Sequence, residues 1–182
     1  MNEYSEKVII DEDEIKRRVA ELVISIADDC PGGDLVVIGI LKGSFIFLAD
    51  MLRLMYLHNL RPQVDFMILS SYGSSTIPST MIKIERDLSV NIEGKFALVV
   101  DDILDTGRTM LYVKERLKWL EPKMIKTCVL LDKPARRKVE MKADYVGFEV
   151  EDRFVVGYGL DFNGYYRERP YVAVLEEQPE AE

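Results

Sequence analysis

The chain has 182 residues, of which 48% are hydrophobic and 31% charged, a size and composition typical of one globular domain with one core. Its 32 acidic residues outnumber the 24 basic ones, and the net charge of -8 is the opposite of what a nucleic-acid-binding surface requires. We therefore expect no nucleic-acid partner.

The first half of the chain alternates predicted helices and strands. From Asp11, apolar residues recur with the spacing of one helical face, and Asp11 with Glu14 forms a capping pair, which predicts a helix to about Ala27. The run 35–40 is continuously apolar and rich in β-branched residues, as in a parallel strand buried on both faces. A helix over 44–58 and a strand over 64–72 follow.

The second half repeats this alternation. Strands are predicted over 96–100 and 125–131, with a helix over 108–120 between them. Further strand candidates, some of them in an antiparallel extension, are 143–150, 154–160 and 171–176. The pattern predicts an α/β fold with a mainly parallel central sheet flanked by helices, in a single domain over 1–182.

Two segments differ from the packed elements in composition. Residues 73–87 hold Gly, Pro and several Ser and Thr, which is typical of a mobile surface loop and fits a lid. The acidic tail over 176–182 is expected to be a frayed, solubilising end without a function.

Cysteine content and hydropathy indicate the cellular location of the protein. Cys30 and Cys128 have no nearby cysteine or histidine, so neither a disulfide framework nor a zinc site is predicted. No apolar run approaches the roughly 18 residues of a membrane span, and the first residues lack the pattern of a leader peptide. These features favour a cytoplasmic protein with no membrane partner.

The segment 99–110, VVDDILDTGRTM, carries the strongest chemical signal. A buried strand ends in carboxylates, and a turn of small residues leads into a helix whose first N–H groups have no partners within the helix. Such a turn binds phosphate, with Gly107 permitting close approach and Thr106, Arg108 and Thr109 adding hydrogen bonds. The segment matches neither a P-loop nor a dinucleotide-binding motif.

Three aspartates accompany this turn. Asp101 and Asp102 point to opposite sides if the strand continues through them, so one of them is expected to face sugar hydroxyls or metal-bound water. Carboxylates beside a phosphate site suit Mg²⁺, which shares its coordination with phosphate oxygens. For Asp105, a plain alternative is that it caps the helix that follows.

The segment VVDDILDTG resembles the phosphoribosyl-pyrophosphate-binding motif of type I phosphoribosyltransferases, and the acid at Asp105 resembles their 6-oxopurine branch. The resemblance to hypoxanthine-guanine phosphoribosyltransferases extends through ILKGSFIFLADML, VDFMILSSYG, LLDKPARR and FVVGYGLDFNGYYR. It implies the type I fold, with a small hood formed by the terminal segments and a mobile loop. The family commonly has Glu-Asp where this chain has Asp101-Asp102, which shortens the reach of the first acid.

The resemblance implies a purine salvage enzyme. Its reaction transfers the phosphoribosyl group of 5-phosphoribosyl 1-pyrophosphate to N9 of hypoxanthine or guanine, giving IMP or GMP and pyrophosphate, with Mg²⁺ as cofactor. Asp105 would be the base that holds the purine N7 proton. A positioned base contributes about 10² to 10⁴-fold in rate.

The same resemblance assigns the remaining roles. Lys42 and Gly43 would bind pyrophosphate through a loop with a non-proline cis peptide, and Arg167 would bind pyrophosphate as well. Lys133 would donate to the purine O6, which adenine lacks, while Phe154 would stack on the base and Val155 read its edge. Further expected site residues are a metal ligand at Asp161 and the start of the lid at Ser71 and Tyr72. From spacing alone, Lys42 and Lys133 are surface lysines, Phe154 belongs to the core, and Asp161 with Arg167 forms a loop ion pair.

Two alternative functions remain at this point. Spacing cannot rank hypoxanthine, guanine and xanthine, so a xanthine- or guanine-preferring phosphoribosyltransferase is one alternative. The other is an RNA-binding regulator on the same fold. The acidic residue at position 105 and the low pI, near 4.9, argue against this alternative, because RNA binding requires a basic surface. The family forms dimers and tetramers, which implies a homo-oligomer.

Overall fold

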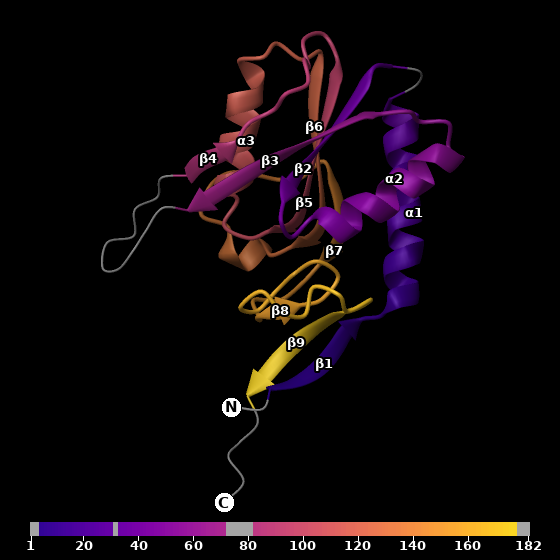
Figure 1. Cartoon of the computed structure of the whole chain (residues 1–182). Helices are drawn as coiled ribbons and strands as arrows, with labels where there is room; N and C mark the ends of the chain where they lie inside the picture. The colour runs from indigo at the N-terminus through magenta and orange to yellow at the C-terminus, as the bar shows by residue number, and fades with distance from the viewer. Residues whose placement is uncertain (1–3, 31–32, 72–81, 178–182) are drawn as a thin grey trace, which may run out of the picture.

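The structure, a computed structural model, describes residues 4–30, 33–71 and 82–177. Its elements in chain order are β1 (Tyr4–Ile10), α1 (Glu12–Asp29), β2 (Leu35–Leu41), α2 (Phe45–Leu57), β3 (Gln63–Ser71), β4 (Ile82–Arg86), β5 (Phe96–Leu104), α3 (Arg108–Lys118), β6 (Met124–Asp132), a 3-10 turn (Pro134–Arg136), β7 (Tyr145–Glu149), β8 (Val155–Val156) and β9 (Val172–Glu177). Figure 1 shows these elements arranged as a larger upper part and a smaller lower part.

The larger part is built on a six-stranded sheet in the order β4-β3-β2-β5-β6-β7. The strands from β3 to β7 in this order run parallel, and β4 lies antiparallel on the β3 edge. The smaller part is a three-stranded antiparallel sheet, β1-β9-β8, which brings the two ends of the described chain together. The mainly parallel sheet and the hood of terminal segments predicted above are confirmed.

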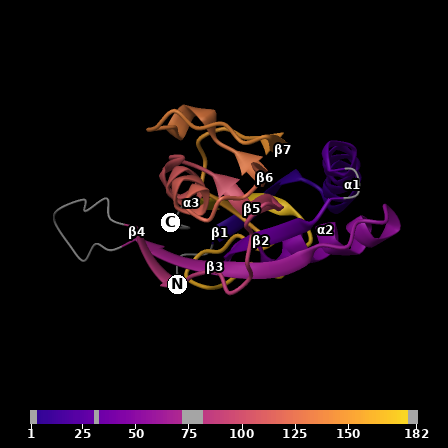
Figure 2. The same ribbon diagram turned by 90° about the horizontal axis from the view of Figure 1, so that it is seen from above.

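The central strands are apolar on both faces because each face packs against helices. In β2, Val36 and Ile38 belong to a core cluster with α3, while Leu35 and Val37 belong to one with α1 and α2. This alternation is the two-residue period of a strand. Seen from above in Figure 2, α3 lies on one side of the sheet and α1 with α2 on the other.

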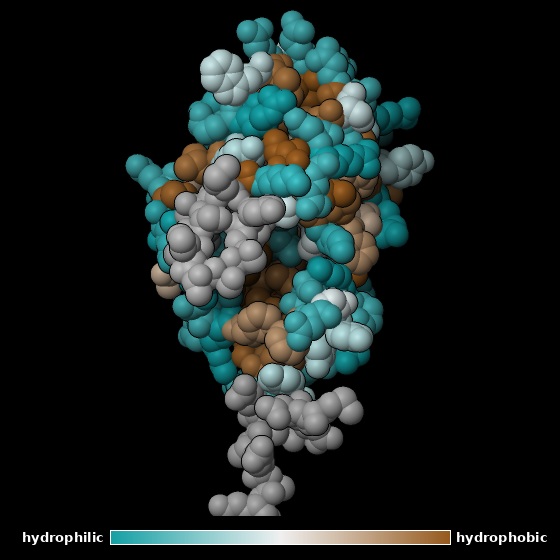
Figure 3. All heavy atoms as spheres, turned by 60° about the vertical axis from the view of Figure 1, so that its left-hand side comes forward, coloured by the Kyte–Doolittle hydropathy of each residue, from teal (hydrophilic) through white to brown (hydrophobic). Residues whose placement is uncertain are grey.

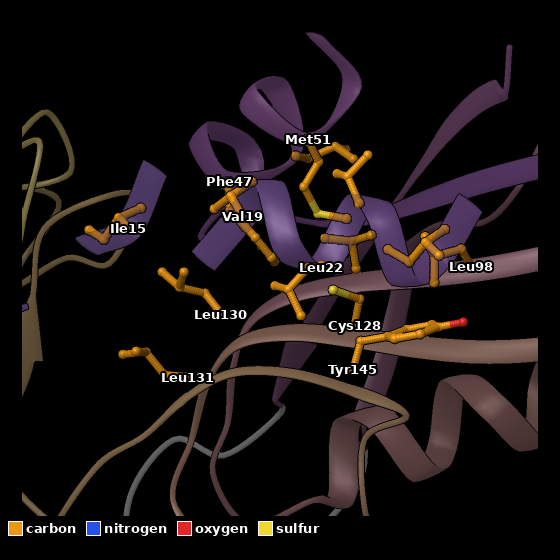
Figure 4. Close-up of a cluster of buried hydrophobic side chains, with 14 of the residues drawn as sticks. Ile15, Val19, Leu22, Phe47, Met51, Leu98, Cys128, Leu130, Leu131 and Tyr145 are labelled. Atoms are coloured by element: carbon orange, nitrogen blue, oxygen red, sulfur yellow. The ribbon is translucent and has the colours of Figure 1, made fainter. Parts of the chain in front are cut away.

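Helix α1 begins as its sequence predicts. The Asp11 side chain accepts from the N–H of Glu14 at 2.8 Å, and the Glu14 side chain accepts from the N–H of Asp11 at 3.0 Å. Its apolar face enters the core beside Phe47 and Met51 of α2, as Figure 4 shows. No helix within the described ranges is long and apolar enough to cross a membrane.

Some predicted boundaries are wrong. Residues 82–86 were predicted to belong to a loop over 73–87, but they form β4. The half-buried Ile82 and Ile84 alternate with exposed residues where β4 pairs with β3. Residues 73–81 lie outside the described residues. Glu176 and Glu177, placed in the tail, pair with β1, and 178–182 lie outside the description. Over 154–160 only Val155–Val156 is a strand, because the chain then turns through glycines with positive φ. Strand β1 was not predicted.

Candidate active site

A cavity of about 330 Å³ lies where the carboxyl ends of β2 and β5 meet. From β2 the chain continues to β3 on one side, and from β5 it continues to β6 on the other. The site is therefore a topological switch point, where open α/β sheets bind ligands. The walls include Lys42, Gly43, Asp101, Asp102, Asp105, Thr106, Gly107 and Thr109. Figure 3 shows a hollow on one face of the molecule, with both hydrophilic and hydrophobic atoms visible in it.

The turn after β5 has the form expected of a phosphate-binding loop. Gly107 is the N-cap of α3 and has φ +82°, a left-handed conformation that glycine adopts without strain. The Thr106 hydroxyl accepts a long hydrogen bond of 3.4 Å from the N–H of Arg108. Because the N-cap is Gly107 and no side chain caps α3, the alternative of Asp105 as a helix cap is wrong. Arg108 is exposed and does not line the cavity.

Asp101 and Asp102 line the same cavity, although strand alternation was expected to separate them. Asp101 accepts from the N–H of Asp102 at 3.0 Å, and Asp102 accepts from that of Ile103 at 2.9 Å, so both carboxylates fold back on the strand. Burial raises the pKa of both carboxyls, most strongly that of Asp101, which also faces the Asp102 charge. Two buried acids sharing one site are suited to a cation.

Asp105 presents a buried oxygen to this region. Its Oδ1 atom makes no hydrogen bond to any residue the structure describes, although the Nε atom of Arg136 lies 2.9 Å away. Arg136 also donates to Asp152 at 3.2 Å. The Asp105 carboxylate is thus held beside a cation through Oδ1, while the side chain remains 39% exposed and lines the cavity, so that Oδ2 keeps its capacity to accept a proton.

Lys133 lies close by and is buried, with 6% of its surface exposed. Its ammonium donates to the carbonyl of Arg153, the residue before Phe154. Burial lowers the pKa of Lys133, and the charges of Asp105 and Asp152 oppose this. Lys133 is therefore not the surface lysine of the plain alternative, and it connects the central sheet to the start of the hood.

The hood supplies an aromatic ring and a backbone edge. Phe154 is 54% exposed and packs edge-on against Phe162, with ring centroids 5.5 Å apart. The core position that spacing alone suggested for Phe154 is wrong. Val155 is buried in β8. An exposed ring beside a buried lysine suits a flat heterocycle.

The loop after β2 approaches the acids very closely. The Leu41–Lys42 peptide is cis, as the resemblance implies, and Lys42 is exposed. A Cβ atom on Gly43 would lie 1.6 Å from Oδ2 of Asp102, and one on Gly159 would lie 2.1 Å from the Gly43 carbonyl oxygen. Glycine is thus required at both positions for the loop, β5 and the hood to meet.

Arg167 and Asp161 form a pair at the edge of the hood. Arg167 donates to the Gly159 carbonyl, and its other nitrogen lies 2.7 Å from the Asp161 carboxylate. The Arg167 charge acts on Asp102, whose pKa it lowers against the effect of burial. Asp161 does not line the cavity, and the described residues contain no cluster of three acidic, histidine or cysteine side chains placed to hold a metal.

Two predicted residues cannot be placed. Ser71 ends β3, and its side chain lies outside the description, as does all of Tyr72. The structure adds cavity residues that sequence reasoning missed, among them Leu69, Ser70 and Ile82. It also adds Arg136 and Arg137, whose only signal was their place in the motif LLDKPARR.

Comparisons with known proteins agree with this geometry. Residues 7–163 match the model of the phosphoribosyl transferase domain. The chain is 49% identical over 172 residues to a hypoxanthine-guanine phosphoribosyltransferase of Aquifex aeolicus, covering 94% of this chain and 95% of that one. Identity to the Bacillus subtilis enzyme of the same name is 45%, covering 93% of each. A crystal structure of a hypoxanthine-guanine phosphoribosyltransferase from Bacillus anthracis superposes with a TM-score of 0.88 at 42% identity, covering 94% of this chain and 99% of that one.

Proposed function

The chain belongs to the phosphoribosyl transferase domain family, and we propose that it is a purine salvage enzyme acting on hypoxanthine and guanine. The reaction joins the purine N9 to C1′ of 5-phosphoribosyl 1-pyrophosphate. The bond from C1′ to the pyrophosphate oxygen breaks with its electrons on the leaving group, and the products are IMP or GMP and pyrophosphate. The observation that carries this proposal is the cavity in which Asp101, Asp102, Asp105 and the 105–109 turn meet.

The turn binds the 5′-phosphate. The N–H groups of Asp105, Thr106 and Gly107 donate to no described residue and are free to bind an anion, and the dipole of α3 adds partial positive charge. The hydroxyls of Thr106 and Thr109 line the same cavity and add hydrogen bonds. Lys42 and the backbone of Gly43 face the leaving pyrophosphate across the cavity, and Arg167 adds charge from the hood side.

Asp101 and Asp102 would hold Mg²⁺ and the ribose hydroxyls. Two carboxylates are enough for this ion, because it keeps several waters and takes its remaining ligands from phosphate oxygens. Burial raises the pKa of both acids, so a cation beside them compensates an unfavourable pair of charges. When bound, Mg²⁺ supplies charge neutralisation for the pyrophosphate. Asp161 would reach the ion only after separating from Arg167, so we give it a secondary role.

Asp105 accepts the N7 proton of the purine as N9 attacks. Its Oδ1 atom is buried and paired with Arg136, but the side chain is 39% exposed and lines the cavity, so the other oxygen, Oδ2, is the one that can take this proton. Lys133 donates to O6 of the base, a contact that the amino group of adenine cannot accept. Phe154 stacks on the ring, and the backbone of Val155 reads its outer edge.

The names of the curated relatives help to decide between this function and the two alternatives. Curated relatives from Aquifex aeolicus, Bacillus subtilis and Escherichia coli are named as hypoxanthine or hypoxanthine-guanine phosphoribosyltransferases, which favours an enzyme over an RNA-binding regulator. No observation favours xanthine over hypoxanthine and guanine. The free, buried cysteines suit the reducing cytoplasm, where we place the protein. The exposed Phe45, Tyr56 and Leu57 of α2 support a homo-oligomer, a dimer or a tetramer.

The test is a panel of hypoxanthine, guanine, xanthine and adenine with 5-phosphoribosyl 1-pyrophosphate and Mg²⁺, with pyrophosphate release as the readout. We expect turnover of hypoxanthine and guanine, none of adenine, and loss of turnover when the metal is chelated. Comparable turnover of adenine, or no pyrophosphate release with any purine, would contradict the proposal.

A further inference from the structure

The 105–107 turn is held from behind by the segment that follows β6. The carbonyl of Leu104 accepts from the N–H of Lys133 at 3.0 Å, and that of Thr106 accepts from the N–H of Lys138 at 3.0 Å. Between them, the Arg137 guanidinium donates to the carbonyls of Leu104, at 2.8 Å, and of Asp105. Three consecutive peptide oxygens are thus fixed on one side of the turn.

Fixing the oxygens also fixes the N–H groups. In a planar trans peptide the C=O and N–H bonds point in opposite directions. The N–H groups of Asp105, Thr106 and Gly107 are therefore turned away from Arg137. None of the three donates to another residue that the structure describes. The same three residues line the cavity, so the turn is an anion-binding concavity formed before any ligand arrives.

Arg137 is the only side chain of the described residues that contacts these carbonyls. It is ion-paired with Asp132 at the end of β6, and the two side chains are only 16% and 17% exposed. Its alkyl stem packs under the turn, because a Cβ atom on Gly107 would lie 2.9 Å from Cδ of Arg137. The guanidinium thereby joins the carboxyl ends of β5 and β6.

We propose that Arg137 is a positioning residue for phosphate binding, which presets the 105–107 N–H groups without touching the substrate. The proposal rests on the proposed function, because the phosphate in question is that of the ribosyl donor. In the absence of Arg137 the peptide between Asp105 and Thr106 is free to rotate. The turn would then have to be ordered by the ligand, at the expense of affinity.

The test measures binding of ribose 5-phosphate and of 5-phosphoribosyl 1-pyrophosphate to Arg137→Met and Arg137→Lys by calorimetry, together with steady-state kinetics. Losing hydrogen bonds from a charged donor corresponds to about tenfold to hundredfold weaker binding. We expect Arg137→Met to weaken both ligands by this factor while the KM for hypoxanthine changes little. Arg137→Lys keeps the pair with Asp132 and one donor, so its loss should be intermediate.

Arg18 offers a matched control. It also donates to two backbone carbonyls, those of Gly147 and Val146, each at 2.8 Å, but on β7 and away from the cavity. Arg18→Met should lower the melting temperature and leave phosphate binding unchanged. In amide NMR, ribose 5-phosphate should shift the signals of 105–107 in the wild type and in Arg18→Met, and much less in Arg137→Met.

The possible outcomes distinguish a failure of the Arg137 inference from a failure of the proposed function. If the wild type binds both ligands and Arg137→Met binds them equally well, Arg137 has only a structural role and the inference is overturned. If the wild type binds neither ligand, the proposed function fails and the inference fails with it. Reduced phosphate affinity in Arg137→Met, with normal affinity in an Arg18→Met protein of similar melting temperature, would support the positioning role.

Discussion

The buried Oδ1 atom of Asp105 lies 2.9 Å from the Nε atom of Arg136 and makes no hydrogen bond to any described residue. The ion pair and the unmet acceptor together define what this carboxylate can do. Arg136 holds the Oδ1 side of the carboxylate, and the side chain is 39% exposed and lines the cavity, which leaves Oδ2 for the substrate. Asp105 is therefore suited to accept a proton, and α3 does not need it as a cap.

Asp105→Asn should lower turnover by about two to four orders of magnitude, because the amide cannot accept the N7 proton. Affinity for 5-phosphoribosyl 1-pyrophosphate should change much less, since in the proposed mechanism backbone N–H groups hold the phosphate. The melting temperature should remain nearly unchanged because Gly107 is the N-cap. Asp152→Asn, which removes the other partner of Arg136, is the control and should keep most of the activity. Near-normal turnover of Asp105→Asn would refute the general-base role.

Lys133→Met should raise the KM for hypoxanthine and guanine by about 10- to 100-fold, the value of a hydrogen bond from a charged donor. The KM for the ribosyl donor should stay close to that of the wild type. Initial rates at varied concentrations of each substrate separate the two effects. Lys95, which donates to Gln63 at 2.7 Å on the surface, supplies the control Lys95→Met. An unchanged KM for both purines in Lys133→Met would exclude the contact with O6.

Gly43→Ala should damage the site through Asp102. The new Cβ atom would lie 1.6 Å from Oδ2 of Asp102, so the carboxylate or the loop must move. A displacement of about 1 Å in a site can reduce turnover by about 10²-fold. Gly33→Ala, whose Cβ would meet only Cys30 Sγ at an ordinary 3.6 Å, should be almost neutral. Kinetics as a function of Mg²⁺ concentration should show a higher metal requirement for Gly43→Ala, and equal requirements would contradict this reading.

Asp65→Asn should destabilise the protein at neutral pH. Asp65 is buried and accepts from the N–H groups of Phe66, Ser89 and Val90. Burial alone would raise its pKa, but these hydrogen bonds outweigh burial and lower the pKa below its ordinary 3.8. Each hydrogen bond to a charged acceptor contributes about 1.5 to 3 kcal/mol to the free energy of unfolding. The loss should be smaller than the sum of these contributions, because the asparagine retains some of the hydrogen bonds.

The sign of the pH dependence follows from this lowered pKa. The unfolded chain binds the proton more readily than the folded one, so the stabilisation is complete above about pH 4 and is lost as the pH falls through the lowered pKa. Denaturant melts of the wild type at pH 7 and near pH 3 should therefore differ more than those of Asp65→Asn. Parallel curves for the two proteins would show that Asp65 contributes nothing to acid sensitivity.

The parallel sheet, its helices and the acidic turn were predictable because their signals are local. Apolar runs such as 35–40 and the capping pair at Asp11 need no knowledge of distant residues. Strand β1 was missed because its partner β9 lies at the other end of the chain and most of its side chains are exposed or half-buried. Arg137 was missed because backbone carbonyls, its main partners, are present at every residue and leave no signature in the sequence.

The pairing of β1 with β9 determines when the hood can form during synthesis. Tyr4 is among the first described residues to leave the ribosome, yet its partner in the sheet is Glu177. The strands β2 to β7 can pair as they emerge, because their partners are nearer in sequence. Strand β1 must wait, unpaired, until β9 has been synthesised. Residues 101–109 of the proposed phosphate site are also made before Phe154, the ring proposed to stack on the purine.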